Sequence, residues 1–169
     1  MTTERGRDIV VGVDHSDFGV AALRWAISEA AESGRRVVAL RAWAFEPIAD
    51  LGAAVSGSPR VVEEAHRRDL DEVVARVGAD HPDVVVETRL VEHSPSVALV
   101  EASRTAAMIV LGSHGRGRLL NLLVGSVAER CLREANCPVV VIPANTVPAP
   151  EKATAPSELE GSYYPGPLL

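Results

Sequence analysis

The sequence predicts an α/β fold in which a single domain holds a five-stranded, mostly parallel sheet with helices on both faces. Short apolar segments rich in Val and Ile alternate along the chain with segments whose apolar residues recur at helical spacing. The short segments are hydrophobic at almost every position, which is typical of strands that helices cover on both faces. Alternation of this kind favours parallel strand pairing with right-handed crossovers.

The strands are expected over residues 9–13, 36–44, 84–91, 107–111 and 139–142. The helices are expected over residues 18–33, 60–78, 97–105 and 126–134. Ser16 or Asp17 is the expected N-cap of the first helix, and Gly34 fits the position just after its end. Pro95 suits the first turn of the third helix, after a capping sequence that begins at Ser94.

The second helix is amphipathic, and its Glu, His and Arg residues are expected to face outward. Its inner stripe is expected to consist of Val61, Val62, Ala65, Leu70, Val73, Val74 and Val77. Residues 46–59 contain Pro and Gly among small residues, so we expect an irregular, mobile loop there. Trp25 is expected in the core, whereas Trp43 suits either the core or a pocket wall.

The length of 169 residues suits one domain, expected over residues 1–144, followed by a Pro-rich, flexible tail over residues 145–169. The net charge of −6 argues against nucleic acid or an anionic membrane as the main partner. Because neither a signal peptide nor an apolar stretch of roughly 18 residues is evident, a cytoplasmic protein is expected. Cys131 and Cys137 are expected to be buried structural thiols.

A glycine-rich segment after the fourth strand is the clearest candidate for a binding site. Gly112, Gly115 and Gly117 fall within six residues, and the pair Gly125-Ser126 opens the last helix. Glycines permit positive φ angles and a close approach of backbone to ligand, and a helix N-terminus offers N–H groups to anions. Asp14 follows the first strand, so it is expected on the same rim of the parallel sheet.

Two common phosphate-binding motifs do not fit this segment. A Walker A loop needs a lysine, which the segment lacks, and a dinucleotide fingerprint would follow the first strand, where only Gly12 occurs. The structural alternative is that the glycines form a tight turn and a helix cap. Asp14 has a similar alternative, since it could simply cap the first helix.

The spacing Gly112-x2-Gly115-x9-Gly125-Ser126 resembles the G-x2-G-x9-G-(S/T) motif of the ATP-binding subgroup of the universal stress protein family. Three further segments resemble that family: Ile-Val-Val-Gly-Val-Asp at residues 9–14, Ala-Leu-Arg-Trp-Ala at residues 22–26, and Cys-Pro-Val-Val-Val-Ile-Pro at residues 137–143. The resemblance covers residues 8–143 and implies a Rossmann-like fold of the adenine nucleotide alpha hydrolase type.

The resemblance implies an ATP site. Asp14 would hold the ribose hydroxyls or, more weakly supported, Mg²⁺ near the phosphates. The backbone of Ala42 would meet the adenine, although family members often carry Val there. The residues that would wrap the ribose and phosphates are Gly112, Ser113, Gly115 and Arg116, with Gly125, Ser126 and Val127 giving N–H groups and a hydroxyl. Their expected neighbours are Gly12, His114, Gly117 and Arg118.

The leading hypothesis for function is a nucleotide-dependent regulatory module of the stress response that holds ATP. No general base is evident to activate water, and a solvent-facing role is favoured for His114 over a catalytic one. The alternatives are a slow Mg²⁺-dependent ATP hydrolase or phosphotransferase, and a nucleotide-free interaction protein. The resemblance also implies a homodimer through the last strand, whose apolar edge invites pairing at Val139, Val140, Val141 and Ile142.

Overall fold

The computed structural model describes residues 8–44, 59–114 and 124–143 of the chain. Within these residues, a five-stranded sheet has the order β3-β2-β1-β4-β5, and all neighbouring strands are parallel. The strands are β1 (Asp8–Gly12), β2 (Arg36–Trp43), β3 (Val86–Glu92), β4 (Met108–Gly112) and β5 (Val139–Ile142). The predicted parallel α/β fold is confirmed. The predicted tail, and all of the predicted loop except Pro59, lie outside the described residues.

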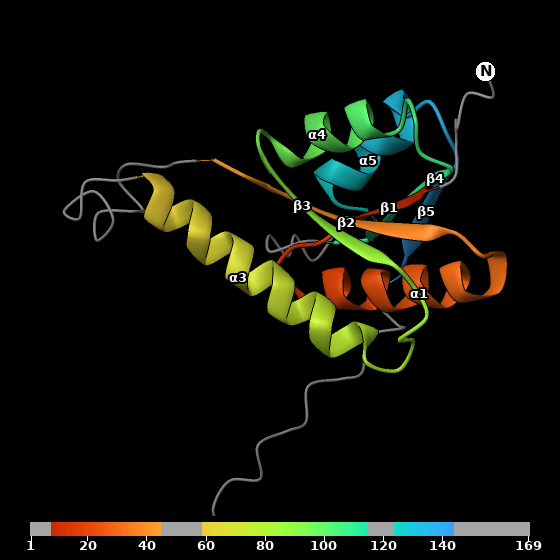
Figure 1. The fold of residues 1–169 in the computed structure, drawn as a ribbon. Coiled ribbons are helices and arrows are strands. Elements are labelled where there is room, and N and C mark those ends of the chain that lie inside the picture. Colours follow the sequence, from red (N-terminus) through yellow and green to blue (C-terminus); the bar gives the residue numbers. More distant parts are fainter. Residues whose placement is uncertain (1–7, 45–58, 115–123, 144–169) are drawn as a thin grey trace, which may run out of the picture.

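Two pairs of helices cover the sheet (Figure 1). They are α1 (Asp17–Ser33) and α3 (Pro59–Gly78) on one face, and α4 (Pro95–Ala102) and α5 (Ser126–Glu134) on the other. The chain moves outward from β1 through β2 to β3, and then returns to β4 on the other side of β1. The strand order therefore reverses between β1 and β4, which is where ligands bind in open sheets of this kind.

The strand side chains alternate between two cores, one on each face of the sheet. Ile9 and Val11 of β1 belong to the core beneath α1 and α3, whereas Val10 belongs to the core beneath α4 and α5. In register with Val10 lie Val38 of β2 and Ile109 of β4, which share its core. The uniform hydrophobicity of the strands thus follows from burial on both sides.

Local hydrogen bonds explain where the helices begin and end. The Ser16 hydroxyl accepts a bond from the Gly19 N–H, so Ser16 is the N-cap of α1, and Gly34 ends α1 in the left-handed conformation with φ 66°. Helix α4 ends at Ala102, three residues before the predicted end. There the buried Ser103 hydroxyl donates to the Val100 carbonyl over 2.6 Å and accepts from the Asn136 N–H over 2.9 Å.

Strand β3 begins at Val86, two residues later than predicted, because the preceding residues form a turn. In that turn the Val84 N–H donates to the His81 carbonyl. The Val85 carbonyl still accepts a bond from the Val37 N–H, so the chain enters the sheet just before β3 starts. The other strands begin and end within one residue of their predicted bounds.

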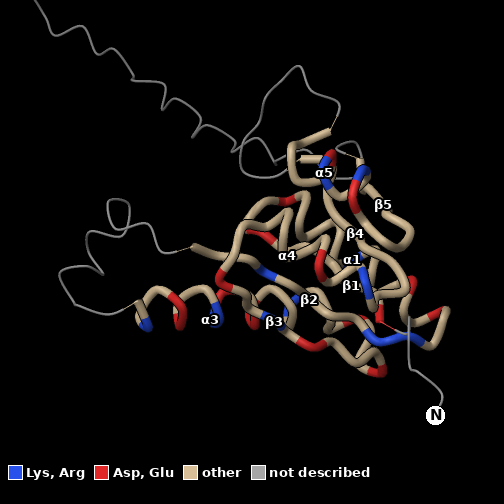
Figure 2. The backbone as a smooth tube through the Cα atoms, turned by 90° about the horizontal axis from the view of Figure 1, so that it is seen from above, with Lys and Arg blue, Asp and Glu red and all other residues tan. Residues whose placement is uncertain are grey.

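Helix α3 departs from its predicted inner stripe. Its N-terminal half projects beyond the sheet, and both acidic and basic residues lie along it (Figures 1 and 2). Val61 is therefore 47% exposed and Ala65 is exposed, contrary to the prediction, whereas Leu70 and Val77 pack into the core. The C-terminal half thus provides most of the packing of this helix.

The two cysteines are free thiols, and their surroundings make them poor nucleophiles. Cys131 is fully buried, and burial raises its pKa to about 11. Burial also raises the pKa of Cys137, which is partly buried. Since only the thiolate is reactive, the prediction of structural thiols fits Cys131 well, and Cys137 only in part because it is not fully buried.

Shortening a core leucine should destabilise the fold strongly. Leu23 of α1 is 0% exposed, so Leu23→Ala should lower the free energy of unfolding by about 2–5 kcal/mol through lost burial and an internal cavity. Leu132→Ala is the matched control, because Leu132 of α5 is 54% exposed and its loss should change stability by less than about 1 kcal/mol. Urea unfolding of both variants measures the difference. Equal losses would contradict this assignment of the core.

Candidate functional site

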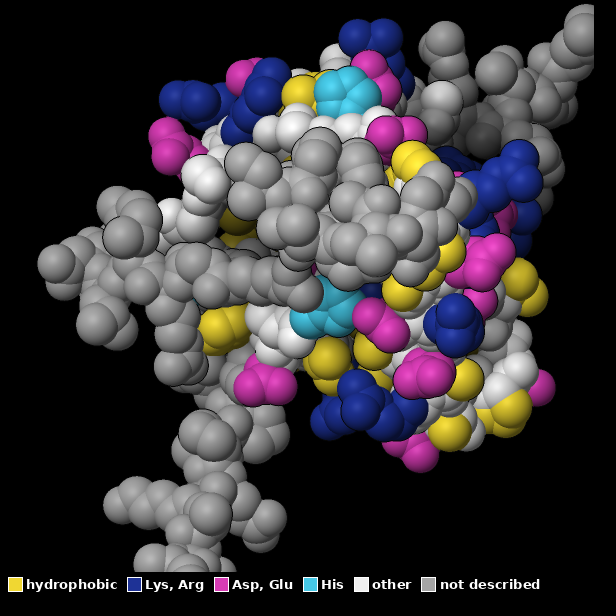
Figure 3. All heavy atoms as spheres, turned by 90° about the vertical axis from the view of Figure 1, so that its left-hand side faces the viewer, with side chains coloured by type: hydrophobic (Ala, Val, Ile, Leu, Met, Phe, Trp, Pro, Cys, Tyr) yellow, Lys and Arg dark blue, Asp and Glu magenta, His cyan; other side chains and the backbone are white. Residues whose placement is uncertain are grey.

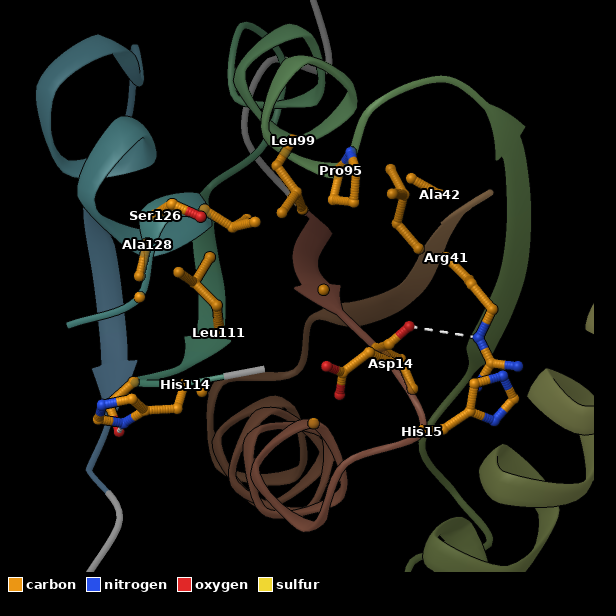
Figure 4. Close-up of a pocket in the computed structure, with 18 of the residues that line it drawn as sticks. Asp14, His15, Arg41, Ala42, Pro95, Leu99, Leu111, His114, Ser126 and Ala128 are labelled. Atoms are coloured by element: carbon orange, nitrogen blue, oxygen red, sulfur yellow. Dashed lines mark hydrogen bonds between the residues drawn. The ribbon is translucent and has the colours of Figure 1, made fainter. Parts of the chain in front are cut away.

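A pocket of about 380 Å³ lies where β1, β2 and β4 end (Figure 4). Figure 3 shows the molecule from the side at which these strands end. Hydrophobic, acidic, basic and histidine side chains are interspersed on this surface. The residues that line the pocket are Gly12, Val13, Asp14, His15, Gly19, Leu40, Arg41, Ala42, His66, Pro95, Leu99, Leu111, Gly112, Ser113, His114, Gly125, Ser126, Val127 and Ala128. Its volume suits a small-molecule ligand, and it lies at the reversal of strand order between β1 and β4.

Two backbone hydrogen bonds bring the separated parts of the glycine-rich segment together. The Gly125 N–H donates to the Ser113 carbonyl over 2.7 Å, and the Ser113 N–H donates to the Ile142 carbonyl over 2.8 Å. Helix α5 therefore starts directly beside the end of β4. The predicted site residues that the structure gathers here are Gly112, Ser113, His114, Gly125, Ser126 and Val127. Gly115, Arg116, Gly117 and Arg118 lie outside the described residues.

The N-terminus of α5 forms one wall of the pocket. Gly125 is its N-cap, and among the described residues no side chain caps the helix. The first turn, Ser126 to Ala128, lines the pocket, so its N–H groups and the positive end of the helix dipole lie at this wall. Such a wall favours an anionic group.

Asp14 forms a tight turn between β1 and α1. Its Oδ1 accepts hydrogen bonds from both the N–H and the hydroxyl of Ser16, and Ser16 in turn caps α1. Asp14 therefore supports the cap without being the cap itself. A Cβ atom at Gly19 would lie 2.5 Å from Asp14 Oδ1, so only glycine lets the carboxylate take this position. Asp14 lines the pocket between the α5 wall and Arg41 (Figure 4).

The glycines of the site serve close packing. In the described part of the chain only Gly34 has a positive φ, so Gly112 and Gly125 do not use the left-handed conformations that glycine permits. A Cβ atom at Gly112 would lie 2.6 Å from Phe18 Cβ and 2.9 Å from the Phe18 carbonyl carbon. Gly112 thus allows the first turn of α1 to pack against the end of β4.

One side of the pocket is an apolar slot on the face of the sheet that α4 and α5 cover (Figure 4). The residues that form it are Leu40, Ala42, Pro95, Leu99, Leu111 and Val127. Gly12 lies at its base, where a Cβ atom would come within 3.1 Å of the Leu99 side chain. Ala42 and Gly12 are therefore at the pocket, as the sequence predicted, and a flat apolar group fits beside them.

Histidine side chains lie along the polar rim. His114 is partly buried, with its ring 5.7 Å from the Phe18 ring and its Nδ1 3.1 Å from the Ser113 hydroxyl. The solvent-facing position favoured for His114 therefore stays a prediction, because the residue is only partly buried although its ring contacts Phe18 of α1. His15 Nε2 lies 3.7 Å from Asp69 Oδ2 of α3.

Sequence reasoning did not nominate several of the lining residues, among them the charged Arg41 and the histidine His66. His66 was expected to face outward from α3, but its ring lies 5.8 Å from the Trp43 ring and 6.1 Å from the His15 ring. Trp43 is buried beneath it and belongs to the packing under α3 instead of the pocket lining. The sequence did contain a sign that Arg41 is unusual. It is a charged residue in the otherwise apolar face of β2 that Val37, Ala39 and Trp43 form.

The described residues offer neither a cluster of metal ligands nor a helix suited to a membrane. Among the described residues, no group of three or more His, Cys, Asp or Glu side chains could hold a metal ion. In the same part of the chain, no helix combines the length and the hydrophobicity needed to cross a membrane.

Adding a methyl group at Gly112 should disturb the junction between α1 and β4. Gly112→Ala would force Phe18 and the first turn of α1 outward, so the free energy of unfolding should fall by about 1–3 kcal/mol. Gly78→Ala is the control, because nothing lies within 4 Å of the added Cβ there. Urea unfolding tests both variants, and a Gly112→Ala protein as stable as the control would show that this contact is not tight.

Comparison with known proteins agrees with the fold. The model of the universal stress protein family matches residues 6–143. A universal stress protein of Mycobacterium tuberculosis (strain ATCC 25618 / H37Rv) is 33% identical over 133 residues, which cover 79% of this chain and 44% of that protein. The chain thus spans about half the length of this relative.

Two solved structures are similar at 25% sequence identity and a TM-score of 0.58. One is a universal stress protein from Archaeoglobus fulgidus in complex with dAMP, where the match covers 80% of this chain and 96% of that one. The other is a universal stress protein in complex with cAMP, where it covers 82% of this chain and 97% of that one. With the parallel sheet and the matching family model, these findings establish that the chain belongs to the universal stress protein family.

Proposed function

We propose that this chain binds ATP in the pocket at the ends of β1, β2 and β4 and acts as a nucleotide-dependent regulatory protein of the stress response. The observation that carries the proposal is the N-terminus of α5, which no described side chain caps and which the bond from Gly125 to Ser113 places beside an apolar slot. A helix end that favours anions suits the phosphates of a nucleotide, and the apolar slot beside it suits the base.

The apolar slot is suited to the adenine base. Ala42 lies at the slot, where backbone groups at the end of β2 could meet the edge of the base, while Leu99 and Leu111 flank its faces. The dAMP and cAMP of the two similar structures both contain adenine, which supports this choice of base.

The phosphates would lie at the α5 wall. Among the described residues of this wall, the N–H groups of the first turn of α5 and the Ser126 hydroxyl are the donors. The glycine motif suggests that Gly115, Arg116, Gly117 and Arg118 add further contacts. Asp14 would accept hydrogen bonds from the ribose hydroxyls. As a single carboxylate it could hold Mg²⁺ only together with phosphate oxygens and water, as is usual for this ion.

The site is better suited to holding ATP than to cleaving it. Among the described lining residues Asp14 is the sole carboxylate, and its Oδ1 already accepts two hydrogen bonds from Ser16. The His114 ring packs against Phe18. A general base must reach the attacking water, and neither side chain has that placement.

Analysis of the bound nucleotide tests the proposal directly. The purified protein is denatured and the released nucleotide is identified by mass spectrometry. The refolded or nucleotide-stripped protein is then titrated with ATP, AMP and cAMP and incubated with ATP and Mg²⁺ for hours. We expect ATP to bind and to persist. Rapid formation of ADP would favour the hydrolase, and absence of adenine nucleotide binding would leave only a nucleotide-free interaction protein.

Replacing the Asp14 carboxylate should weaken nucleotide binding selectively. Asp14→Asn keeps the size of the side chain but removes its charge, so we expect the dissociation constant for ATP to rise about 10-fold or more, as for loss of a charged hydrogen bond. Asp17→Asn is the matched control, since Asp17 is exposed in the first turn of α1 outside the pocket. Isothermal titration calorimetry measures both constants. An unchanged constant in Asp14→Asn would remove Asp14 from the site.

We also propose a homodimer that forms through β5, an edge strand of the sheet. The carbonyls of Pro138 and Ile142 accept bonds from Ile109 and Ser113 on the β4 side. Because backbone groups alternate along a strand, those of Val139 and Val141 point away from β4 and could pair with a second copy.

A proline at Val141 tests this dimer. Val141→Pro removes an outward N–H while leaving the bonds from β5 to β4 intact, so the dimer should dissociate. Thr88→Pro makes the same kind of change on β3, the opposite edge, and should leave the dimer intact. Light scattering after size-exclusion chromatography gives the mass of each variant. A wild-type monomer, or a dimer that survives Val141→Pro, would contradict the proposed interface.

A further inference from the structure

Arg41 is a buried arginine whose hydrogen bonds join two elements of the pocket. Its side chain is 2% exposed and extends from the end of β2 toward α3 (Figure 4). Its Nε donates to the Val13 carbonyl over 3.3 Å, shown as a dashed line in Figure 4, and its Nη1 donates to the His66 carbonyl over 3.2 Å. A buried charge is costly unless it is hydrogen-bonded, so a role that needs the guanidinium is indicated.

One end of this connection holds the turn that presents Asp14. Val13 directly precedes Asp14, and its N–H donates to the Leu40 carbonyl over 2.9 Å. Its carbonyl is the acceptor for Arg41. The peptide units on both sides of Val13 are therefore fixed to the end of β2, and this fixes the direction in which the chain enters the Asp14 turn.

The other end holds the middle of α3. Leu70 and Val77, which belong to the core beneath α1 and α3, lie in the C-terminal half of this helix. The N-terminal half, in which Val62 is buried, projects beyond the sheet (Figure 1). His66 lies between these two parts and lines the pocket. Side chains from the ends of β1 and β2 contact this segment: Arg41 at the His66 carbonyl, Trp43 at the His66 ring and His15 at Asp69.

We propose that Arg41 is a positioning residue for the nucleotide pocket, and that its guanidinium couples occupancy of the pocket to the placement of α3. The inference rests on the proposed nucleotide binding. A planar guanidinium can donate in two fixed directions at once, so it sets the Asp14 turn and the His66 segment relative to each other. By linkage, a ligand that needs this arrangement also stabilises it.

The coupling gives α3 a role in reporting the bound nucleotide. The face of α3 away from the pocket is exposed and carries charged residues of both signs, including Arg67 and Arg68 (Figure 2). Nucleotide binding would hold this face in one position relative to the sheet.

Two arginine variants test the positioning role. Arg41→Met keeps an apolar stem of similar length but removes every donor, so the dissociation constant for ATP should rise about 10-fold or more. Arg68→Met is the control, because Arg68 is exposed on α3 and does not line the pocket, and it should bind ATP as the wild type does. Arg41→Lys keeps the charge without the planar fork and should restore less than half of the lost binding free energy. Calorimetric titration at 10 °C measures the dissociation constants. Thermal unfolding and far-UV circular dichroism show whether each variant is folded at that temperature.

Hydrogen exchange of the wild type tests the coupling without any substitution. Adding ATP should slow exchange of the α3 amides at residues 66–70, and Arg41→Met should abolish this protection even at saturating ATP. If Arg41→Met binds ATP like the wild type while unfolding at a lower temperature, Arg41 is only structural. If ATP leaves α3 exchange in the wild type unchanged, the coupling is wrong while nucleotide binding stands. If the wild type binds no ATP, the proposed function itself fails.

Discussion

The hydrogen bond from the Gly125 N–H to the Ser113 carbonyl connects the two parts of the chain that meet at the pocket. It places the first turn of α5 at the end of β4, and the bond from Ser113 to the Ile142 carbonyl ties both to the edge of the sheet. The site therefore depends on backbone geometry more than on any one side chain.

The pocket combines two kinds of wall that different parts of the chain supply. The apolar slot is an extension of the core beneath α4 and α5, so the packing that stabilises the fold also shapes it. The polar wall depends on individual hydrogen bonds, among them those of Asp14 and Arg41. Substitutions in the slot should therefore change stability and binding together, whereas changes in the polar wall can separate the two.

The sequence allowed the strands, the helices and the parallel α/β fold to be predicted, because hydrophobic period is a local signal. Glycine spacing likewise pointed to residues that the structure places at one pocket. It failed where a position depends on distant parts of the chain. Val61 and His66 follow the helical pattern of α3, but only the tertiary structure shows that the helix projects past the sheet, which exposes Val61 and brings His66 to the pocket. Gly112 was expected to contact a nucleotide, and the structure shows that it also makes room for Phe18, a contact that no local pattern reveals.

The pairing of β1 with β4 has a consequence for how the protein is made. Ile9 pairs with Met108, about 100 residues away in sequence, and closing so long a loop is a slow step in folding. The β1-α1-β2 unit can form early from nearby contacts, but the pocket is completed only when β4 and α5 join the sheet. During synthesis, then, the pocket cannot form until nearly all of the described sequence has emerged.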